Sequence, residues 1–566
     1  MTLQTQSAPA PEPGKTKDPI WYASYPPAVP KTIDPDAYPS LPALLLDACT
    51  RHAAHPAFDC LGARMTYTEW ERVSRAFAAF LLQEAKLRPG ERVAIMLPNL
   101  LAYPVAFLGV LRAGLIVVNV NPLYTPRELK EQLEDSGASA IVIMENFAHK
   151  LESVVAETKI RHVVVARLGD FMTVLKRTLF NFANTYVRRA VPAWRFDTVT
   201  LLQDACSRRP PAGYEDAEPE ASSPALLQYT GGTTGVPKGA VLTHRNLVAN
   251  ALQCRAVIKP YLTEEQGSVL TPLPLYHIFS LTANLLAFAL MGGRSVLVPD
   301  PRNLKGLIRT MREAQVTTMT GVNTLFNALI NNPEFAALDF SKLEFAVGGG
   351  AAVQSAVAER WREITKSELV EGYGLTEASP VVCINPVSHP KIGTVGLPVP
   401  STEVSIRDDQ GNDQPVGEAG EICVRGPQVM QGYWQRPEET QLVLSADGWL
   451  HTGDIGAFDN EGFLRILDRK KDMINVSGFK VFPNEVEDVM AQHPGVLEAA
   501  VIGVADPHTG QGVKLFVVKR DAGLTEEELT KFARVRLAAY KVPKIIVFVD
   551  SLPKSNIGKI IRKDLK

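Results

Sequence analysis

Short apolar segments alternate with longer amphipathic segments over the first two thirds of the chain. Residues 92–96, 116–120 and 140–144 are apolar runs of strand length, separated by helix-length stretches. A second series follows at residues 268–271, 295–298, 316–319, 345–347 and 368–371. Strands that are apolar throughout and alternate with helices indicate parallel sheets covered on both faces. The pattern predicts an α/β protein whose large N-terminal region contains two packed, doubly wound α/β layers.

Two helices have clear N-terminal signals. Thr125 stands at an N-cap position, Pro126 follows at the first helical position, and Glu128 completes a capping box. Thr525 and Glu528 form the same pattern near the C-terminus. We therefore expect helices to begin at residues 126 and 526.

The pattern changes after about residue 400. Short strands separated by Gly, Asn and Asp turns predict a β-rich subdomain over about 400–468. Beyond the charged cluster 468–472, a helix from Pro483 and strands at 497–504 and 514–519 predict a small α+β unit. We expect a large N-terminal domain over 36–468 and a small C-terminal domain over 469–566, with the boundary in the charged cluster. Residues 1–35 are expected to be a flexible leader, because their first twenty residues are polar and rich in Pro and Ala.

Composition narrows the class of protein. The chain has 566 residues, of which 46% are hydrophobic and 21% charged, as in a globular protein with a large core. Its net charge of -2 argues against a dedicated nucleic-acid binder. The six cysteines include no C-x-x-C pair, so neither a zinc site nor a disulfide framework is indicated. A cytoplasmic protein fits best, and a homodimer stays open.

Two nearly uncharged runs resemble membrane spans in length. Residues 93–111 contain Pro98 and Pro104, and residues 266–293 contain Pro272, Pro274 and the polar His277. Prolines interrupt a membrane-spanning helix. Both runs are therefore predicted to be buried strand and helix.

Residues 171–196 have a different character. Their apolar side chains recur at helical spacing, and their five Lys and Arg residues have no acidic neighbour within the segment. Two interpretations are equally supported: peripheral contact with the inner face of the cytoplasmic membrane, or an ordinary amphipathic helix packed on the protein itself.

The densest candidate for phosphate chemistry is residues 229–239, YTGGTTGVPKG. Its backbone N–H groups, hydroxyls and ammonium can surround a polyphosphate. A Walker A loop requires Ser or Thr after its lysine, whereas Lys238 is followed by Gly239. The segment indicates polyphosphate binding outside the P-loop class, with a Gly-rich surface turn as the alternative. The candidate residues are Thr230, Gly231, Gly232, Thr233, Thr234, Gly235 and Lys238.

Four further strings follow in order: GYGLTE at 372–377, HTGD at 451–454, DRKKD at 468–472 and PKSNIGK at 553–559. With YTGGTTGVPKG, they resemble the adenylate-forming acyl-CoA synthetase and luciferase superfamily over nearly the whole chain. Within it, NPLYTPREL, LPLYHIF and VSGFKVFPNEVEDV are similar to the bacterial long-chain fatty-acid CoA ligases.

The resemblance implies a two-step reaction in a large adenylation domain, with a small mobile C-terminal domain that rotates about a hinge at about 468–472. A fatty acid attacks the α-phosphorus of ATP to give acyl-adenylate and pyrophosphate, and coenzyme A then displaces AMP. ATP, Mg²⁺ and coenzyme A are thus expected. A carboxylic acid with a pKa near ~4.5 is already ionised at neutral pH, so the first step needs alignment and charge neutralisation rather than a general base.

The resemblance also implies residue roles. Lys559 is expected to contact the acyl carboxylate and phosphate, His277 to position the acid, Thr376 to bond the α-phosphate and Glu377 to hold magnesium. The other implied contacts are Gly349, Gly350, Gly372, Tyr373 and Gly374 around adenine, Asp454 and Arg469 at the ribose, and Gly478, Phe479 and Lys480 along the pantetheine tunnel.

Other functions stay open at this point. Taken singly, the same residues fit turn glycines, a core aromatic ring or a solvated lysine. A ligase for a medium-chain or aryl acid would share every motif, because acid-pocket residues are scattered along the chain. Luciferase-type oxidation of the adenylate, and a non-catalytic membrane-bound acyl sensor, are further alternatives.

Overall fold

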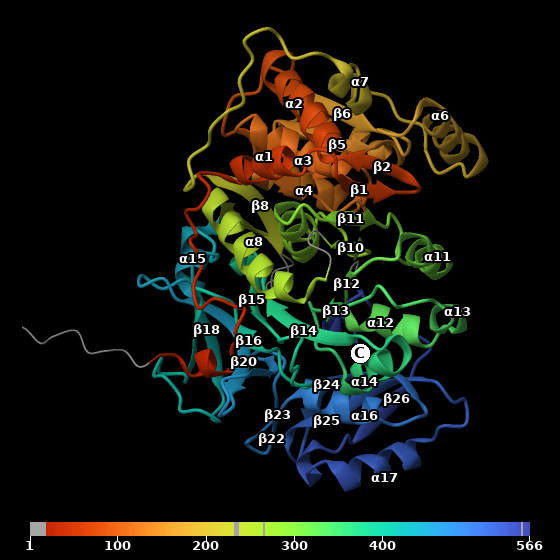
Figure 1. Ribbon diagram of the computed structural model, residues 1–566. Helices are drawn as coiled ribbons and strands as arrows, with labels where there is room; N and C mark the ends of the chain where they lie inside the picture. The colour runs from red at the N-terminus through yellow and green to blue at the C-terminus, as the bar shows by residue number, and fades with distance from the viewer. Residues whose placement is uncertain (1–17, 231–236, 264–266, 556–557, 566) are drawn as a thin grey trace, which may run out of the picture.

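The computed structural model describes residues 18–230, 237–263, 267–555 and 558–565 (Figure 1). Two large sheets, each parallel at its centre with antiparallel strands added at the edge, form most of the molecule. The first has nine strands, in the order β16 Leu397–Pro398, β15 Val381–Ile384, β14 Glu368–Gly374, β13 Phe345–Gly348, β12 Thr318–Gly321, β10 Ser268–Thr271, β11 Arg294–Leu297, β1 Pro56–Cys60 and β2 Ala63–Thr66. Strands β14 to β1 in this order are mutually parallel.

The second sheet has eight strands. Their order is β19 Gly432–Tyr433, β9 Lys238–Thr243, β8 Pro224–Thr230, β4 Ile116–Asn119, β3 Arg92–Met96, β5 Ala140–Met144, β6 His162–Ala166 and β7 Thr200–Leu201. From β8 to β7 all pairs are parallel. The two predicted α/β layers are confirmed.

Helices cover both faces of each large sheet. One continuous core joins the two sheets, since it contains Phe58 and Leu297 of the first and Val93 and Ala140 of the second. The helices between residues 41 and 365 are α1 Leu41–Arg51, α2 Tyr67–Gln83, α3 Ala102–Arg112, α4 Pro126–Ser136, α5 Ala148–Glu152, α6 Val174–Phe182, α7 Leu202–Ser207, α8 His244–Ile258, α9 Ile278–Ser280, α10 Ala287–Leu290, α11 Leu304–Ala314, α12 Asn323–Ile330, α13 Pro333–Ala336 and α14 Ser355–Thr365. Separate cores pack α11, α12 and α14 on the outer face of the first sheet, and α4 on that of the second.

The predicted capping boxes are present. The Thr125 side chain accepts a hydrogen bond from the Glu128 N–H, and the Glu128 side chain accepts one from the Thr125 N–H. The same reciprocal pair, Thr525 and Glu528, starts α17 Glu526–Arg536. Each pair satisfies N–H groups that a helix leaves without partners at its first turn.

The last third of the chain forms two smaller sheets. An antiparallel sheet contains β17 Glu403–Arg407, β18 Gly420–Arg425, β20 Leu450–Phe458 and β21 Leu464–Arg469, with α15 Pro437–Val443 beside it. A five-stranded sheet contains β23 Phe479–Val481, β22 Ile474–Val476, β25 Gly510–Lys519, β24 Val496–Asp506 and β26 Ile545–Phe548. With α16 Pro483–Ala491 and α17, this sheet builds the small domain, which has its own core and lies at the bottom of Figure 1.

The predicted leader, residues 1–35, is too long. Residues 18–35 lie on the body of the protein: a 3₁₀ turn, Ile20–Ser24, buries Trp21, whose ring stacks on Phe458 at 5.2 Å between centroids. The composition of the segment, rich in Pro, Ala and polar residues, does not predict this contact. A single buried aromatic ring is enough to hold a short segment on the protein.

Both apolar runs that resemble membrane spans are internal. Residues 93–111 supply β3 and α3, whose side chains are buried. The described part of the second run supplies β10, α9, the π-helix Leu281–Leu286 and α10, also buried. Over the described ranges, no helix combines the length and the hydropathy needed to cross a bilayer.

Candidate active site

A cavity of about 740 Å³ opens where strands of both large sheets end and the small domain meets them. Its wall includes Asn119 at the end of β4, Thr230 at the end of β8, Gly374 at the end of β14, and Lys559 from the small domain. Parallel sheets bind ligands at the carboxyl ends of their strands, where side chains and loop N–H groups converge. The fold therefore brings residues from five separate motifs to one place.

Thr230 and Lys238 face each other across the β8–β9 hairpin and both line the cavity. The Lys238 ammonium lies 5.4 Å from the centroid of the Tyr433 ring. The intervening candidates Gly231, Gly232, Thr233, Thr234 and Gly235 lie outside the described residues. The two ends of the predicted phosphate segment are thus placed at the cavity wall.

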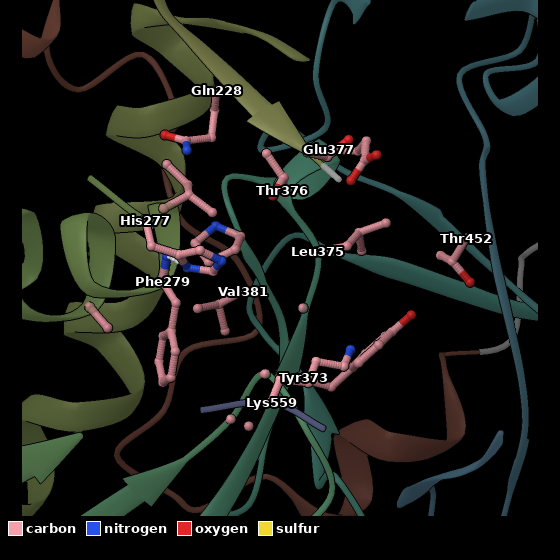
Figure 2. Close-up of a pocket in the computed structure, with 18 of the residues that line it drawn as sticks. Gln228, His277, Phe279, Tyr373, Leu375, Thr376, Glu377, Val381, Thr452 and Lys559 are labelled. Carbon is pink, nitrogen blue, oxygen red and sulfur yellow. Dashed lines mark hydrogen bonds between the residues drawn. The ribbon is translucent and has the colours of Figure 1, made fainter. Parts of the chain in front are cut away.

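The GYGLTE string runs along β14 into a 3₁₀ turn, Thr376–Ala378. Gly372, Tyr373, Gly374, Thr376 and Glu377 all line the cavity. Figure 2 shows Tyr373, Thr376 and Glu377 on the wall that faces His277 and Phe279. A Cβ at Gly374 would lie 2.0 Å from the Pro380 carbonyl oxygen, so only glycine fits there. The segment therefore forms part of the cavity wall through a close backbone contact, and it also supplies functional side chains.

Glu377 has a partner that the sequence does not reveal. The Tyr433 hydroxyl donates a hydrogen bond of 2.7 Å to its Oε1. Burial and this carboxylate raise the pKa of Tyr433, so the hydroxyl stays a donor at neutral pH. Tyr433 belongs to the string GPQVMQGYWQRP, 56 residues from Glu377, and only the fold brings the two together.

Asp454 lies just behind the wall. Its Oδ2 accepts a hydrogen bond of 2.7 Å from the Tyr373 hydroxyl, and its Oδ1 is 3.2 Å from the Arg469 Nε. Asp454 is 5% exposed, and Arg469, its cross-strand neighbour, lines the cavity. Tyr373, predicted at adenine, is thus fixed by the carboxylate predicted at the ribose.

Lys559 and His277 line the same cavity in different charge states. Burial, followed by the positive charge of Arg469, lowers the pKa of Lys559 to about 8. Burial and Lys559 lower the pKa of His277 to about 4, so the imidazole is neutral at pH 7. The His277 Nδ1 accepts a hydrogen bond of 3.4 Å from the Phe279 N–H. The site therefore holds cationic lysine beside a neutral histidine, which suits positioning better than proton transfer.

The cavity continues into an apolar region. Gly349 and Gly350 follow β13 and line the cavity, and a Cβ on Gly349 would approach the Phe279 ring to 3.1 Å. The wall also includes the apolar side chains of Val257, Ile258, Phe288, Met319, Phe345 and Val347. These side chains offer dispersion contacts and no charge, which is the environment an alkyl chain requires.

Gly478, Phe479 and Lys480 are not part of this cavity. Gly478 lies in the exposed turn between β22 and β23, and Phe479 and Lys480 begin β23, where the Phe479 ring, 57% exposed, stacks on Tyr540 at 4.8 Å. The structure therefore brings Lys559, but not the predicted pantetheine residues, to the site.

Known proteins resemble the chain over almost its full length. The family model described as "AMP-binding enzyme" matches residues 45–434, and the model of the AMP-binding enzyme C-terminal domain matches residues 485–559. A long-chain-fatty-acid–CoA ligase of Yersinia pestis is 54% identical over 97% of both chains. A protein of the same name from Escherichia coli O6:H1 is 53% identical over 97% of this chain and 98% of its own.

A solved structure agrees in fold. An anthranilate CoA ligase in complex with anthranoyl-AMP superposes with a TM-score of 0.84 at 25% identity, covering 94% of this chain and 98% of its own. The similarity extends through the small domain as well as the two large sheets.

Proposed function

The chain belongs to the AMP-binding enzyme family, and from this premise we infer that it joins a long-chain fatty acid to coenzyme A with cleavage of ATP to AMP and pyrophosphate. The observation that carries the inference is the cavity, whose wall combines the motif residues with a set of apolar side chains. The long-chain-fatty-acid–CoA ligases of Yersinia pestis and Escherichia coli O6:H1 are about twice as identical to this chain as the anthranilate ligase is. That comparison favours an alkyl acid over an aryl acid.

In the first step, an acyl carboxylate oxygen bonds to the α-phosphorus of ATP as pyrophosphate leaves. This step brings the negative charges of the carboxylate and the phosphates together. We propose that Lys559 and Lys238 neutralise this charge, because both line the cavity and an ammonium acts as a mobile point charge. Thr376 is assigned to the α-phosphate and neutral His277 to the acid. We assign Asp454 and Arg469 to the ribose, with Tyr373 held by its hydrogen bond to Asp454.

Glu377 fits a magnesium ion. Its Oε1 already accepts one hydrogen bond, from Tyr433, and among the described residues its carboxylate has no Lys or Arg ion-pair partner. A carboxylate with free acceptor capacity in a phosphate site is a ligand for a hard cation. When bound, magnesium supplies electrostatic stabilisation of the polyphosphate charge.

The second step requires the coenzyme A thiol sulfur to bond to the acyl carbonyl carbon while AMP leaves. Lys559 occupies the side of the cavity contributed by the small domain. We propose that the small domain rotates about residues 468–472, which removes Lys559 and brings Gly478, Phe479 and Lys480 to the site. The exposure of this turn agrees with the proposal.

Product analysis tests the function. The protein is incubated with Mg-ATP, coenzyme A and saturated acids from four to eighteen carbons, and AMP is separated from ADP. We expect AMP, pyrophosphate and thioester in equal amounts. Each buried methylene adds about 0.8 kcal/mol, so kcat/KM should rise about fourfold per carbon until the apolar region is filled. Formation of ADP, or a maximum at a short or aryl acid, would contradict the assignment.

We also propose that residues 171–196 contact the anionic inner face of the cytoplasmic membrane. Helix α6 projects from the edge of the molecule in Figure 1. Its exposed apolar side chains continue into the π-helix Ala183–Val187, and they are Val174, Leu175, Leu179, Phe182, Tyr186 and Val187, between 55% and 80% exposed. Basic residues accompany them, and each Lys or Arg near an anionic surface adds about 1 kcal/mol. In a symmetric dimer through this patch, the basic side chains of both copies would meet, so lipid is the better partner.

Sedimentation with vesicles checks this surface. We expect the protein to sediment with phosphatidylglycerol vesicles and much less with phosphatidylcholine vesicles. Leu175→Ser combined with Leu179→Ser should lower the bound fraction severalfold, because it removes apolar contact without changing charge. Val535→Ser, at an exposed valine on α17, is the matched control. Equal sedimentation of the double variant and the parent would contradict the proposal.

A further inference from the structure

A buried charge cluster lies beside the segment that carries the catalytic lysine. Arg562 is three residues beyond Lys559, and its side chain is 18% exposed. Its Nε and one terminal nitrogen donate to the two carboxylate oxygens of Glu487, at 3.0 and 2.8 Å. The other terminal nitrogen donates to Asp468 Oδ1 at 2.9 Å and lies 3.6 Å from Asp472. The guanidinium thus binds one carboxylate inside the small domain and two at the hinge.

Asp468 connects the two domains: its backbone belongs to the large domain, and its side chain contacts the small domain. Its backbone lies in β21, paired with Ile455 of β20, and is therefore fixed to the antiparallel sheet of the large domain. Its side chain, 1% exposed, points into the small domain, where Oδ2 accepts a hydrogen bond of 2.8 Å from the Asn484 N–H in the first turn of α16. Oδ1 accepts one from Arg562. Carboxylates are favoured at helix N-termini, so both contacts hold the small domain to this residue.

Within the proposed hinge 468–472, Asp468 and Arg469 are the last residues of β21, so a rotation about the residues that follow them would separate these groups. Asp468 would stay with β20, whereas Asn484 and Arg562 would move with the small domain. Three other hydrogen bonds between the domains, among the described residues, have neutral donors: Thr324 to the Gly558 carbonyl at 2.8 Å, Asn327 to the Leu497 carbonyl at 2.9 Å, and the Ser355 N–H to Asp488 at 3.2 Å. Lys470, beside the hinge, pairs with Asp409 at 2.9 Å and with Glu421 at 3.4 Å, but its side chain is 47% exposed, and exposed ion pairs contribute little.

We propose that Asp468 and Arg562 form a latch that holds the small domain in the adenylation arrangement, with Lys559 in the cavity. This inference rests on the two-step function and the rotation proposed above. Arg562 and Asp468 act through Lys559 and are positioning residues, since neither lines the cavity. Loss of the latch should shift the population of domain arrangements away from adenylation, because only that arrangement contains the pair.

The test compares the two half-reactions in the full chain. Asp468→Asn keeps the size and hydrogen-bonding capacity of the side chain but removes its charge. We expect the rate of acyl-adenylate formation, measured by pyrophosphate exchange, to fall about tenfold. The rate of thioester formation from supplied acyl-adenylate should stay within about twofold of the parent. Trypsin provides a second measurement that does not depend on activity. Lys470 and Lys471 are exposed at the hinge, and cleavage there should become severalfold faster in the variant.

A double-mutant cycle with Arg562→Gln separates the latch from general stability. The two substitutions should be strongly non-additive for adenylation and additive for thioester formation. Arg562→Lys, which keeps a positive charge, should retain more of the adenylation rate than Arg562→Gln. Lys541→Gln is the matched control, because Lys541 pairs with Glu485 at 2.6 Å entirely within the small domain.

Two results would overturn the latch. One is that Asp468→Asn lowers the rates of both half-reactions equally and that Arg562→Lys does the same. This result counts against the latch even if Asp468→Asn acts by unfolding the protein. The other is unchanged adenylation and unchanged tryptic cleavage in a folded Asp468→Asn protein. A parent enzyme that forms no acyl-adenylate would instead refute the proposed function itself, so the two failures are distinguishable.

Discussion

Replacing Lys559 with alanine is expected to slow acyl-adenylate formation by about 10²- to 10³-fold, the effect of removing one preorganised charge from a developing anion. The Lys559 side chain lines the cavity and lies beside Tyr373 in Figure 2, and neutral His277 on the same wall cannot replace its charge. Thioester formation from supplied acyl-adenylate should change little, because the proposed rotation removes Lys559 before that step. Pyrophosphate exchange and thioester formation measure the two steps separately.

Lys554→Ala is the control for this variant. Lys554 lies in the same C-terminal segment, but it pairs with Glu498 at 2.6 Å and is not part of the cavity wall. Its loss should leave both steps near the parent rate. A Lys559→Ala enzyme that forms acyl-adenylate at the parent rate, or that loses both steps equally, would contradict the assigned role.

The same ammonium predicts the pH dependence of adenylation. Burial lowers the pKa of Lys559 to about 8, and the charged form is the one that neutralises phosphate. The charge is present below pH 8 and lost above it, so kcat/KM for ATP should fall as pH rises through about 8. In Lys559→Arg, whose guanidinium stays protonated, this alkaline decline should move to higher pH. An unchanged decline in the arginine variant would assign it to another group.

Much of the fold could be predicted because it depends on local pattern. The β5 strand, Ala140–Met144, and the Thr125 capping box follow from consecutive residues and were placed correctly. One strand was misplaced: residues 316–319 were expected, and β12 begins only at Thr318. Helix α11 ends in a left-handed residue, Gln315, and Val316 belongs to the buried connection that follows. Apolarity alone cannot separate a buried connector from a strand.

The motifs predicted which residues belong to the site, but not which side chains contact one another there. Thr376 and Glu377 stand in a recognisable string, but the Tyr433 hydroxyl and the Tyr229–Asp135 hydrogen bond of 2.6 Å join distant segments. The latch joins residues 94 positions apart in the same way. The spacing of residues along a chain indicates which of them share a helix or strand. Only the tertiary structure shows which side chains are hydrogen-bond or ion-pair partners.

Changing Glu377 to glutamine should raise the magnesium concentration needed for half-maximal adenylation by about tenfold or more and lower the maximal rate by about 10²-fold. The amide keeps an oxygen that can accept from Tyr433, so the wall should stay intact while the ligand loses its charge. Adenylation rates across a magnesium titration give the kinetic effect. Binding of Mn²⁺ in the presence of ATP, followed by electron paramagnetic resonance, reports the metal directly.

Two further variants separate ligand from scaffold. Tyr433→Phe leaves the Glu377 carboxylate but removes its hydrogen-bond donor, so it should shift the magnesium dependence in the same direction by a smaller factor. Glu421→Gln changes another carboxylate of the cavity wall, which accepts from the Gly453 N–H at 3.1 Å, and should leave the magnesium dependence unchanged. If Glu421→Gln alone shifted metal binding, the ligand would be Glu421. If Glu377→Gln bound Mn²⁺ as the parent does, its carboxylate would serve only to hold Tyr433 and the cavity wall.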